Sequence, residues 1–208
     1  QDGKILVLMH KNGVLRWYRM DDGELYLSLY IEGDQWIAWT PDGYYDASTY
    51  GDDLIGWVMN NGLDKAPNVY FASQFERELY RPDIIKKRLQ SLGRTPKPSP
   101  TGGAANLRAI APAKVRIVSP PPGSEVSGED VALQVEVSPS SLPVKALSVY
   151  ANGSPVFHEA ITAKEASAPF SRSVPLPLGA EVNDIRVEAD CEKSLGLAES
   201  QVVRTDQP

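Results

Sequence analysis

Several residue types and patterns that often carry function are scarce in this sequence. One cysteine and two histidines among 208 residues are too few for an internal disulfide or for a zinc site built from these side chains. The longest apolar run, Ile5 to Met9, is far shorter than the roughly 18 residues of a membrane-spanning helix. No basic segment followed by an apolar one opens the chain, so we expect no signal peptide within it and no membrane contact.

Positive charge is also scarce. The formal net charge of −6 and the isoelectric point of about 5.0 argue against a nucleic-acid partner. The sequence contains no phosphate-binding loop, dinucleotide fingerprint or nucleophilic-serine motif, so we expect no cofactor. Apolar residues make up 42% of the chain and charged residues 23%, which are proportions of a globular protein rather than of a disordered one.

A proline-rich segment divides the chain. Residues 93–122 hold seven of the 17 prolines, and Gly102-Gly103 supplies a flexible point. We interpret residues 93–113 as an extended linker between an N-terminal segment, residues 1–92, and a C-terminal segment, residues 114–208.

The N-terminal segment predicts an antiparallel meander of four strands, residues 4–9, 14–20, 24–31 and 35–40. Turn signals separate the strands at Asn12-Gly13, Asp22-Gly23 and Gly33-Asp34. About 40 residues in four short strands is the size of one propeller blade.

Helical signals follow these strands. Apolar residues at helical spacing predict a helix over residues 52–60. Ser73 and Glu76 form a capping box that predicts the start of a second helix, and Pro82 suits the first turn of a third. The helices would cover the sheet; alternatively, the sheet is the last blade of a longer array.

The aromatic-rich N-terminal segment resembles a known bacterial family. The stretches that carry the resemblance are WIAWTPDGYYDAS (residues 36–48), GDDLIGW (residues 51–57), Asn60 and FASQFERELYRPDII (residues 71–85). They resemble the region that ends the WD-repeat propeller in bacterial proteins with a caspase-like peptidase domain of the metacaspase or orthocaspase type. The resemblance implies that the chain is a piece of a longer protein and that the peptidase domain lies outside it.

The C-terminal segment predicts an immunoglobulin-like β-sandwich of about seven short strands. We expect these strands over residues 114–119, 130–137, 145–151, 154–159, 170–174, 183–190 and 198–204. Three stretches, SVYANGSPV (residues 148–156), LPL (residues 176–178) and NDIRVEA (residues 183–189), resemble bacterial immunoglobulin-like modules. In the same multidomain proteins such modules lie between the propeller and the peptidase domain. The expected fold is therefore mostly β, with a propeller-like blade, short helices and a sandwich.

Catalytic residues of the peptidase type are not predicted in this chain. A caspase-like dyad needs a histidine and a cysteine thiolate, and His10, His158 and Cys191 are the candidates. The acidic neighbours of Cys191 would raise the pKa of its thiol, which opposes the role of a nucleophile. We expect this cysteine to be structural or on the surface, and we predict no catalytic residue.

Acidic residues could in principle hold calcium at Asp42, Asp46, Asp52 and Asp53. Their spacing does not match a calcium-binding loop. We interpret Asp42-Gly43 as a turn and Asp52 or Asp53 as the cap of a following helix, so no metal is expected.

Aromatic residues offer the best candidate for a binding face. Tyr44, Tyr45, Tyr50 and Trp57, with Tyr70 nearby, could form a platform for a carbohydrate or peptide. Alternatively, they join the helical segment to the sheet.

Two functions of different classes fit these observations. The first is a non-catalytic scaffold and interaction region that links a propeller to a caspase-like peptidase and contacts a protein partner or the rest of its own polypeptide. Exposed strand edges would then associate, and residues 1–92 alone should self-associate. The alternative is a secreted module that binds a carbohydrate or surface polymer; a small enzyme is a third class. A single cysteine suits the bacterial cytoplasm and periplasm equally, so the compartment is undecided.

Overall fold

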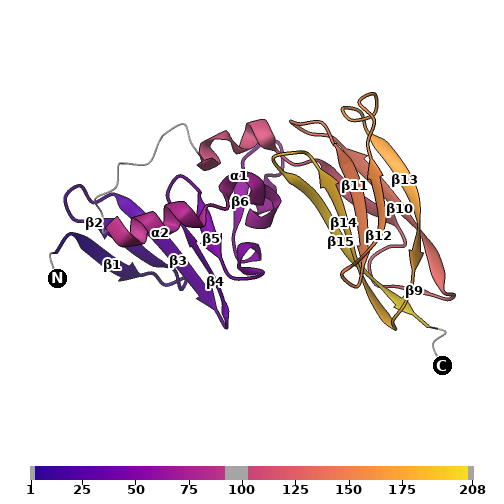
Figure 1. Cartoon of the computed structure of the whole chain (residues 1–208), viewed down its shortest axis with the longest axis horizontal. Helices are drawn as coiled ribbons and strands as arrows, with labels where there is room; N and C mark the ends of the chain where they lie inside the picture. Colours follow the sequence, from indigo (N-terminus) through magenta and orange to yellow (C-terminus); the bar gives the residue numbers. More distant parts are fainter. Residues whose placement is uncertain (1–2, 92–102, 206–208) are drawn as a thin grey trace. The chain divides into compact units, whose positions relative to one another are not determined.

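The computed structural model describes residues 3–91 and 103–205 (Figure 1). The chain is mostly β and divides into two compact units, residues 1–108 and 109–208, which we call the first unit and the second unit. No helix within the described ranges has the length and apolar character to cross a membrane.

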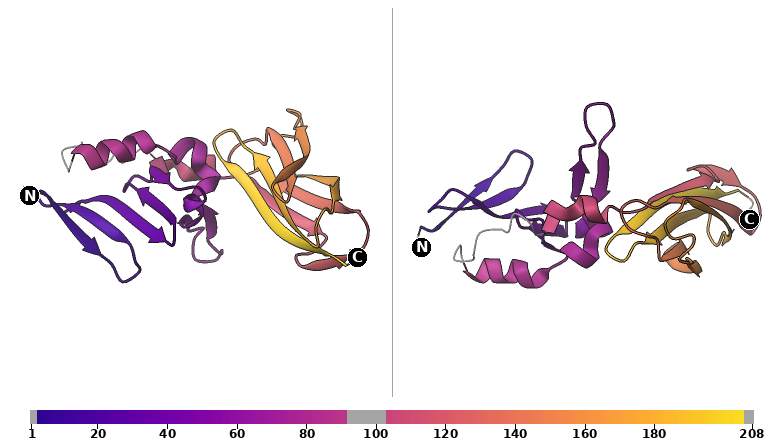
Figure 2. Two further views of the ribbon diagram at one scale, coloured as in Figure 1. Left: turned by 60° about the horizontal axis from the view of Figure 1, so that its bottom comes forward. Right: turned by 90° about the horizontal axis from the view of Figure 1, so that it is seen from above.

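The first unit contains an open antiparallel sheet (Figure 2). Its strands are β1 (Ile5–Met9), β2 (Leu15–Arg19), β3 (Leu25–Glu32), β4 (Gln35–Trp39) and β5 (Tyr45–Ala47). They pair in the order β1-β2-β3-β4-β5, so the four predicted strands are confirmed but the sheet has a fifth. A turn in which the Thr40 amide bonds the Tyr44 carbonyl returns the chain into β5, which is too short to show a period in the sequence.

The helix predicted over residues 52–60 is wrong. Only Gly51–Asp53 is helical, as the 3₁₀ turn η1, and the chain then forms a hairpin of β6 (Gly56–Met59) and β7 (Asn68–Phe71). Over four apolar residues the periods of a helix and of a strand cannot be told apart. The hairpin requires a glycine at position 56, because a Cβ there would lie 2.6 Å from the Tyr70 carbonyl oxygen.

The helical elements of the first unit are η2 (Ala72–Phe75), α1 (Glu76–Leu79) and α2 (Pro82–Ser91). The predicted start at Pro82 is confirmed. The predicted capping box is wrong, because the Ser73 hydroxyl donates to Asp53 and the Phe71 amide donates instead to Gln74 Oε1 at 3.1 Å. Ile85 of α2 packs with Tyr26 of β3 in one apolar cluster, so α2 covers part of the sheet.

The segment interpreted as a linker is partly helical. Residues 93–102 lie outside the described residues, but η3 (Gly103–Ile110) is a 3₁₀ helix in which Leu107 is buried. The extended conformation predicted for residues 103–110 is therefore wrong. Leu107 gives these residues an apolar anchor that the proline count did not reveal.

The second unit consists of two sheets with the orders β13-β10-β8 and β12-β11-β14-β15-β9. The strands are β8 (Lys114–Ser119), β9 (Ser124–Val126), β10 (Asp130–Ser138), β11 (Ala146–Ala151), β12 (Ser154–Ala160), β13 (Phe170–Pro177), β14 (Val182–Asp190) and β15 (Leu195–Arg204). All seven predicted strands are present. The eighth strand, β9, has three residues and pairs in parallel with β15. It was not predicted because it follows closely on a run of prolines and is too short to show an alternating pattern.

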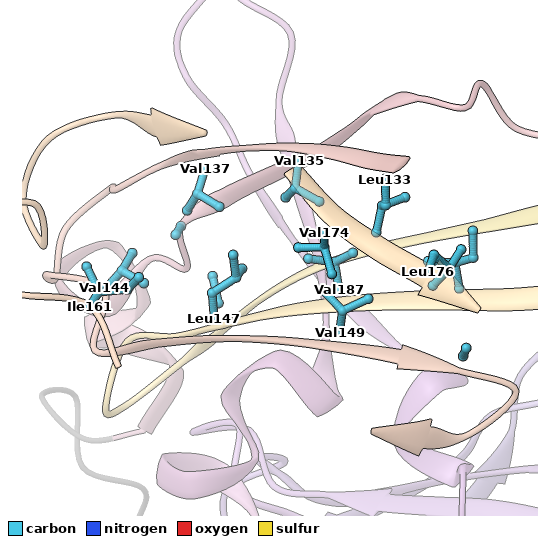
Figure 3. Packing of buried hydrophobic residues seen from close by; sticks show 14 of the residues in the cluster. Leu133, Val135, Val137, Val144, Leu147, Val149, Ile161, Val174, Leu176 and Val187 are labelled. Carbon is cyan, nitrogen blue, oxygen red and sulfur yellow. The ribbon is translucent and has the colours of Figure 1, made fainter. Parts of the chain in front are cut away.

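The core of the second unit lies between its two sheets (Figure 3). Leu133, Val135 and Val137 of β10 face Leu147 and Val149 of β11, and all five side chains are buried. The alternation of apolar residues along β10 therefore reflects a strand with one buried face. The same alternation along β11, β14 and β15 leaves their other side chains on the outer face of the larger sheet.

Candidate functional site

A cavity of about 780 Å³ lies on the outer face of the larger sheet of the second unit. Its volume falls within the range of about 300–1,000 Å³ that is common for small-molecule sites. The side chains of its floor come from three neighbouring strands. They are Tyr150 of β11, Asp184, Arg186 and Glu188 of β14, and Glu199 and Gln201 of β15.

Ion pairs and hydrogen bonds connect the floor of the cavity. Arg186 donates from Nε to Glu188 at 2.7 Å and from Nη1 to Glu199, its cross-strand partner, at 3.4 Å. Gln201 donates to Asp184, also its cross-strand partner, at 2.7 Å. These bonds hold long side chains in one arrangement across two strands, which lowers the conformational entropy that a ligand would have to remove.

Two glycine turns form the rim of the cavity. Gly123 precedes β9 and donates its amide to the Gln201 carbonyl at 2.8 Å. Gly153 lies in the turn between β11 and β12, with φ of +78°, as the Asn152-Gly153 signal predicts. Asn152 bonds the backbone of Asp184 in both directions, so this part of the rim is tied to a floor strand.

A serine and a histidine meet on the same outer face, beside the cavity. Ser148 Oγ lies 2.9 Å from His158 Nδ1. Within the described part of the chain, no carboxylate is hydrogen-bonded to the other ring nitrogen of His158, and Glu188, opposite Ser148, bonds Arg186 instead. The pair therefore lacks the third group that orients the base of a serine nucleophile.

The other candidates for a peptidase dyad lie apart from this pair. Cys191 is fully buried in the core of the second unit, where its thiol lies 3.7 Å from the Ala189 carbonyl oxygen. His10 belongs to the first unit, where its Nε2 lies 3.3 Å from the Tyr18 hydroxyl. Burial of Cys191 supports the structural role expected for it and prevents direct contact between its sulfur and a substrate.

The predicted aromatic residues do not all lie at the surface. Tyr45 is fully buried and its hydroxyl donates to the Ala72 carbonyl; this burial, together with the charge of Asp52, raises the pKa of the phenol. Trp57 is half-buried and packs edge-on against Phe75, with ring centres 5.8 Å apart. These contacts join the hairpin, η2 and β5.

The remaining two aromatic residues are more accessible. Tyr44 is half-buried with the Arg81 guanidinium 6.0 Å from its ring centre, whereas Tyr50 is 73% exposed in a left-handed backbone conformation. A platform that requires Tyr44, Tyr45, Tyr50 and Trp57 on one exposed face is therefore not present.

Three of the four aspartates considered for calcium, Asp42, Asp46 and Asp53, lie against protein groups instead. Asp42 bonds the buried Arg88 at 3.3 Å, and Asp53 accepts from Ser73 at 2.8 Å. Asp46 lies beside Tyr80, where its charge adds to burial in raising the pKa of that phenol. No group of three or more metal-ligating side chains occurs within the described ranges.

The first unit has an exposed apolar edge. Strand β1 stands at the end of the sheet, and its residues Leu6, Val7, Leu8 and Met9 are 42%, 46%, 43% and 74% exposed. The hairpin adds a second apolar surface, where the cross-strand neighbours Val58 and Val69 are both exposed. Folded monomers seldom leave a whole edge strand of large apolar side chains in water.

Sequence reasoning identified the exposed edge but missed the cavity. The floor residues are ordinary outward-facing polar residues in the stretches VNDIRVEAD and LGLAESQVVR. The floor residues become neighbours only through the strand register, which places Arg186 opposite both Tyr150 and Glu199. The one signal available was Tyr150, the single aromatic residue between Ala146 and Ala151 in a strand whose other face is aliphatic.

Comparisons with known proteins do not assign a family. No family model and no curated protein matches the sequence. Among solved structures, an endo-β-1,4-mannanase from Thermotoga petrophila is 11% identical with a TM-score of 0.36, and the match covers 60% of this chain and 24% of the mannanase chain.

Two further solved structures show a similar degree of likeness. Fibronectin(III)-like modules of Clostridium thermocellum CbhA are 15% identical with a TM-score of 0.34, covering 44% of this chain and 45% of that one. A lytic polysaccharide monooxygenase of Jonesia denitrificans is 14% identical with a TM-score of 0.31, covering 41% and 60%. This chain thus spans less than two thirds of each of these three structures, and none of the three indicates its function.

Proposed function

We propose that this chain is a non-catalytic interaction region of a larger bacterial WD-repeat protein of the caspase-like peptidase type. In this proposal the first unit is a propeller-like blade, and the second unit is an immunoglobulin-like module. The chain would link a propeller to the peptidase domain and make protein contacts through its strand edge. The resemblance of residues 36–48, 51–57 and 71–85 to the end of such propellers supports this assignment.

The observation that carries the proposal is the apolar edge strand β1. Its five residues, Ile5 to Met9, include no charge and no proline, which are the devices that usually prevent an edge strand from pairing. Fully burying a Val, Leu or Met side chain contributes roughly 1.5–3 kcal/mol. Covering four partly exposed side chains of this size would therefore contribute several kcal/mol. We infer that an additional strand, from the same polypeptide or a partner protein, covers β1.

The edge is tested by the association state of the 208-residue chain. Without a covering strand, we expect the chain to self-associate through β1 and the Val7→Lys variant to shift toward monomer, because a charge in the edge opposes pairing. The measurement is sedimentation velocity over a wide range of concentrations. The matched control is Val118→Lys, because Val118 is 40% exposed on β8, an edge strand of the second unit.

Two results would contradict this proposal. One is a wild-type chain that stays monomeric throughout, or one whose association the two lysine variants affect equally. The other is peptide hydrolysis by the purified chain that is lost in the Cys191→Ala variant.

The alternative function, carbohydrate binding through the aromatic residues of the first unit, has less support. It would require Tyr45 to be accessible, and this side chain is fully buried. Of the aromatic residues proposed for that platform, only Tyr50 is largely exposed.

A further inference from the structure

We propose that the cavity of the second unit is a binding site for a neutral saccharide. This inference goes beyond the proposed interaction function, because it concerns a different unit and a different kind of ligand. It depends on the floor of the cavity and does not require β1 to be covered.

The first support is the aromatic residue in the floor. Tyr150 lies between Pro155 of β12 and Arg186 of β14 in the register of the sheet, and its side chain is half-buried. A tyrosine in this position presents an apolar ring and a hydroxyl to the same ligand. The C–H groups of a sugar ring can pack on the aromatic ring, while a sugar hydroxyl forms a hydrogen bond with the tyrosine hydroxyl.

The second support is the mixture of hydrogen-bonding groups. Asp184, Glu188 and Glu199 provide acceptors, while Arg186 and Gln201 provide donors. The hydrogen bonds from Arg186 and Gln201 each use one oxygen of a carboxylate, which has about four lone-pair sites in all, so acceptor capacity remains. A sugar hydroxyl both donates and accepts, and neighbouring hydroxyls can therefore bridge a carboxylate and a donor side chain.

The third support is the distribution of charge in the floor. The floor holds three carboxylates and one guanidinium, so its net charge is negative and an anionic ligand would be repelled. A cationic ligand would have to compete with Arg186, which already bonds both Glu188 and Glu199. A neutral ligand with several hydroxyls can use the groups without breaking either ion pair, and the fixed side chains keep the entropic cost of binding low.

The test is isothermal titration calorimetry of the full chain with three neutral β-1,4-linked hexasaccharides, of glucose, mannose and N-acetylglucosamine. We expect at least one to bind with a Kd of about 1 mM or tighter. The variants Tyr150→Leu and Glu199→Gln should each weaken that binding at least about tenfold. The first removes the aromatic ring and its hydroxyl, and the second removes a carboxylate charge without changing the side-chain size. Glu199 is largely exposed, so its variant should fold normally.

The matched control is Glu136→Gln. Glu136 forms an exposed cross-strand pair with Arg116 on the smaller sheet, at 2.6 Å, and therefore reproduces the chemistry of Glu199 away from the cavity. This control should bind as the wild type does. The proposal is overturned if none of the three saccharides binds, if the Tyr150 and Glu199 variants bind unchanged, or if hexalysine binds the cavity in their place. Sedimentation behaviour is independent of these outcomes, so failure here leaves the β1 proposal standing.

Discussion

Arg88 is the side chain that connects α2 to the sheet of the first unit. It is buried, donates from Nη1 to the Tyr26 carbonyl at 3.0 Å, and lies 5.3 Å from the centre of the Tyr26 ring. The Tyr26 hydroxyl donates in return to the Arg88 carbonyl at 2.9 Å. Arg88 also forms an ion pair with Asp42. One side chain thus contacts a turn carboxylate, the backbone of β3 and the ring of Tyr26.

We expect Arg88→Ala to lower the free energy of unfolding of the first unit by about 3 kcal/mol. The change leaves Asp42 buried without its cation, and losing one partner of a buried pair typically costs 3–5 kcal/mol. Tryptophan fluorescence in urea reports on this unit selectively, because all four tryptophans precede residue 60. The exposed neighbour Lys87→Ala serves as the control and should change stability little. Equal effects of the two substitutions would contradict this role for Arg88.

At the scale of elements, Arg172 joins the two sheets of the second unit. It extends from β13 in the smaller sheet and bonds both carboxylate oxygens of Glu159 on β12 in the larger sheet, at 2.7 and 2.9 Å. The guanidinium also reaches Glu165 in the loop between those strands. One side chain thus ties strands that are not hydrogen-bonded neighbours.

This contact predicts a pH dependence of stability. The hydrogen bonds from Arg172 hold the pKa of the Glu159 carboxyl below its ordinary value of 4.5. Because the folded-state pKa is depressed, the stabilisation is complete above pH 4.5 and is lost as pH falls through the lower folded-state value. Thermal melting by circular dichroism, followed from neutral pH downward, should show this loss.

The Arg172→Met variant should flatten part of that acid-side decline. Arg116→Met is the comparison, because Arg116 contacts one oxygen of Glu136 within a single sheet and its loss should alter the profile less. Identical pH profiles for wild type and Arg172→Met would remove Glu159 as a source of acid sensitivity.

Elements differ in how far the sequence determines them. The turns Asn12-Gly13, Asp22-Gly23 and Gly33-Asp34 between apolar runs specified β1 to β4, and the alternation in β10 specified a strand with one buried face. The spacing of apolar residues could not predict the β6–β7 hairpin, because that spacing also fits a helix. The close approach of Gly56 to the Tyr70 carbonyl becomes evident only in the structure. The cavity was not predictable either, since it depends on the register of three strands rather than on any one of them.

At the scale of the whole molecule, net charge opposes association through the apolar edge. The chain carries a formal charge of −6 near pH 7, and every copy therefore repels another. The apolar side chains of β1 act in the opposite direction at all pH values. The balance between these two effects sets the concentration at which chains associate.

We therefore expect self-association to be strongest near pH 5.0, the isoelectric point, and weaker at pH 8. Light scattering at fixed concentration across this range measures the effect. The Val7→Lys variant should scatter less than wild type near pH 5.0, where charge repulsion is smallest and the apolar side chains of β1 dominate, whereas Val118→Lys should not. A decrease in scattering as the pH falls from 8 to 5.0 would contradict the expectation that charge repulsion limits association through β1.

Burial of the single cysteine has a practical consequence for following how this protein opens. Cys191 lies in the core of the second unit, so a thiol-specific reagent can modify it only when that core becomes accessible. The rate of modification therefore measures the opening of the second unit, while the tryptophans measure the first. The unaltered sequence thus carries one spectroscopic and one chemical reporter, and the dynamics of each half can be resolved without attaching a label.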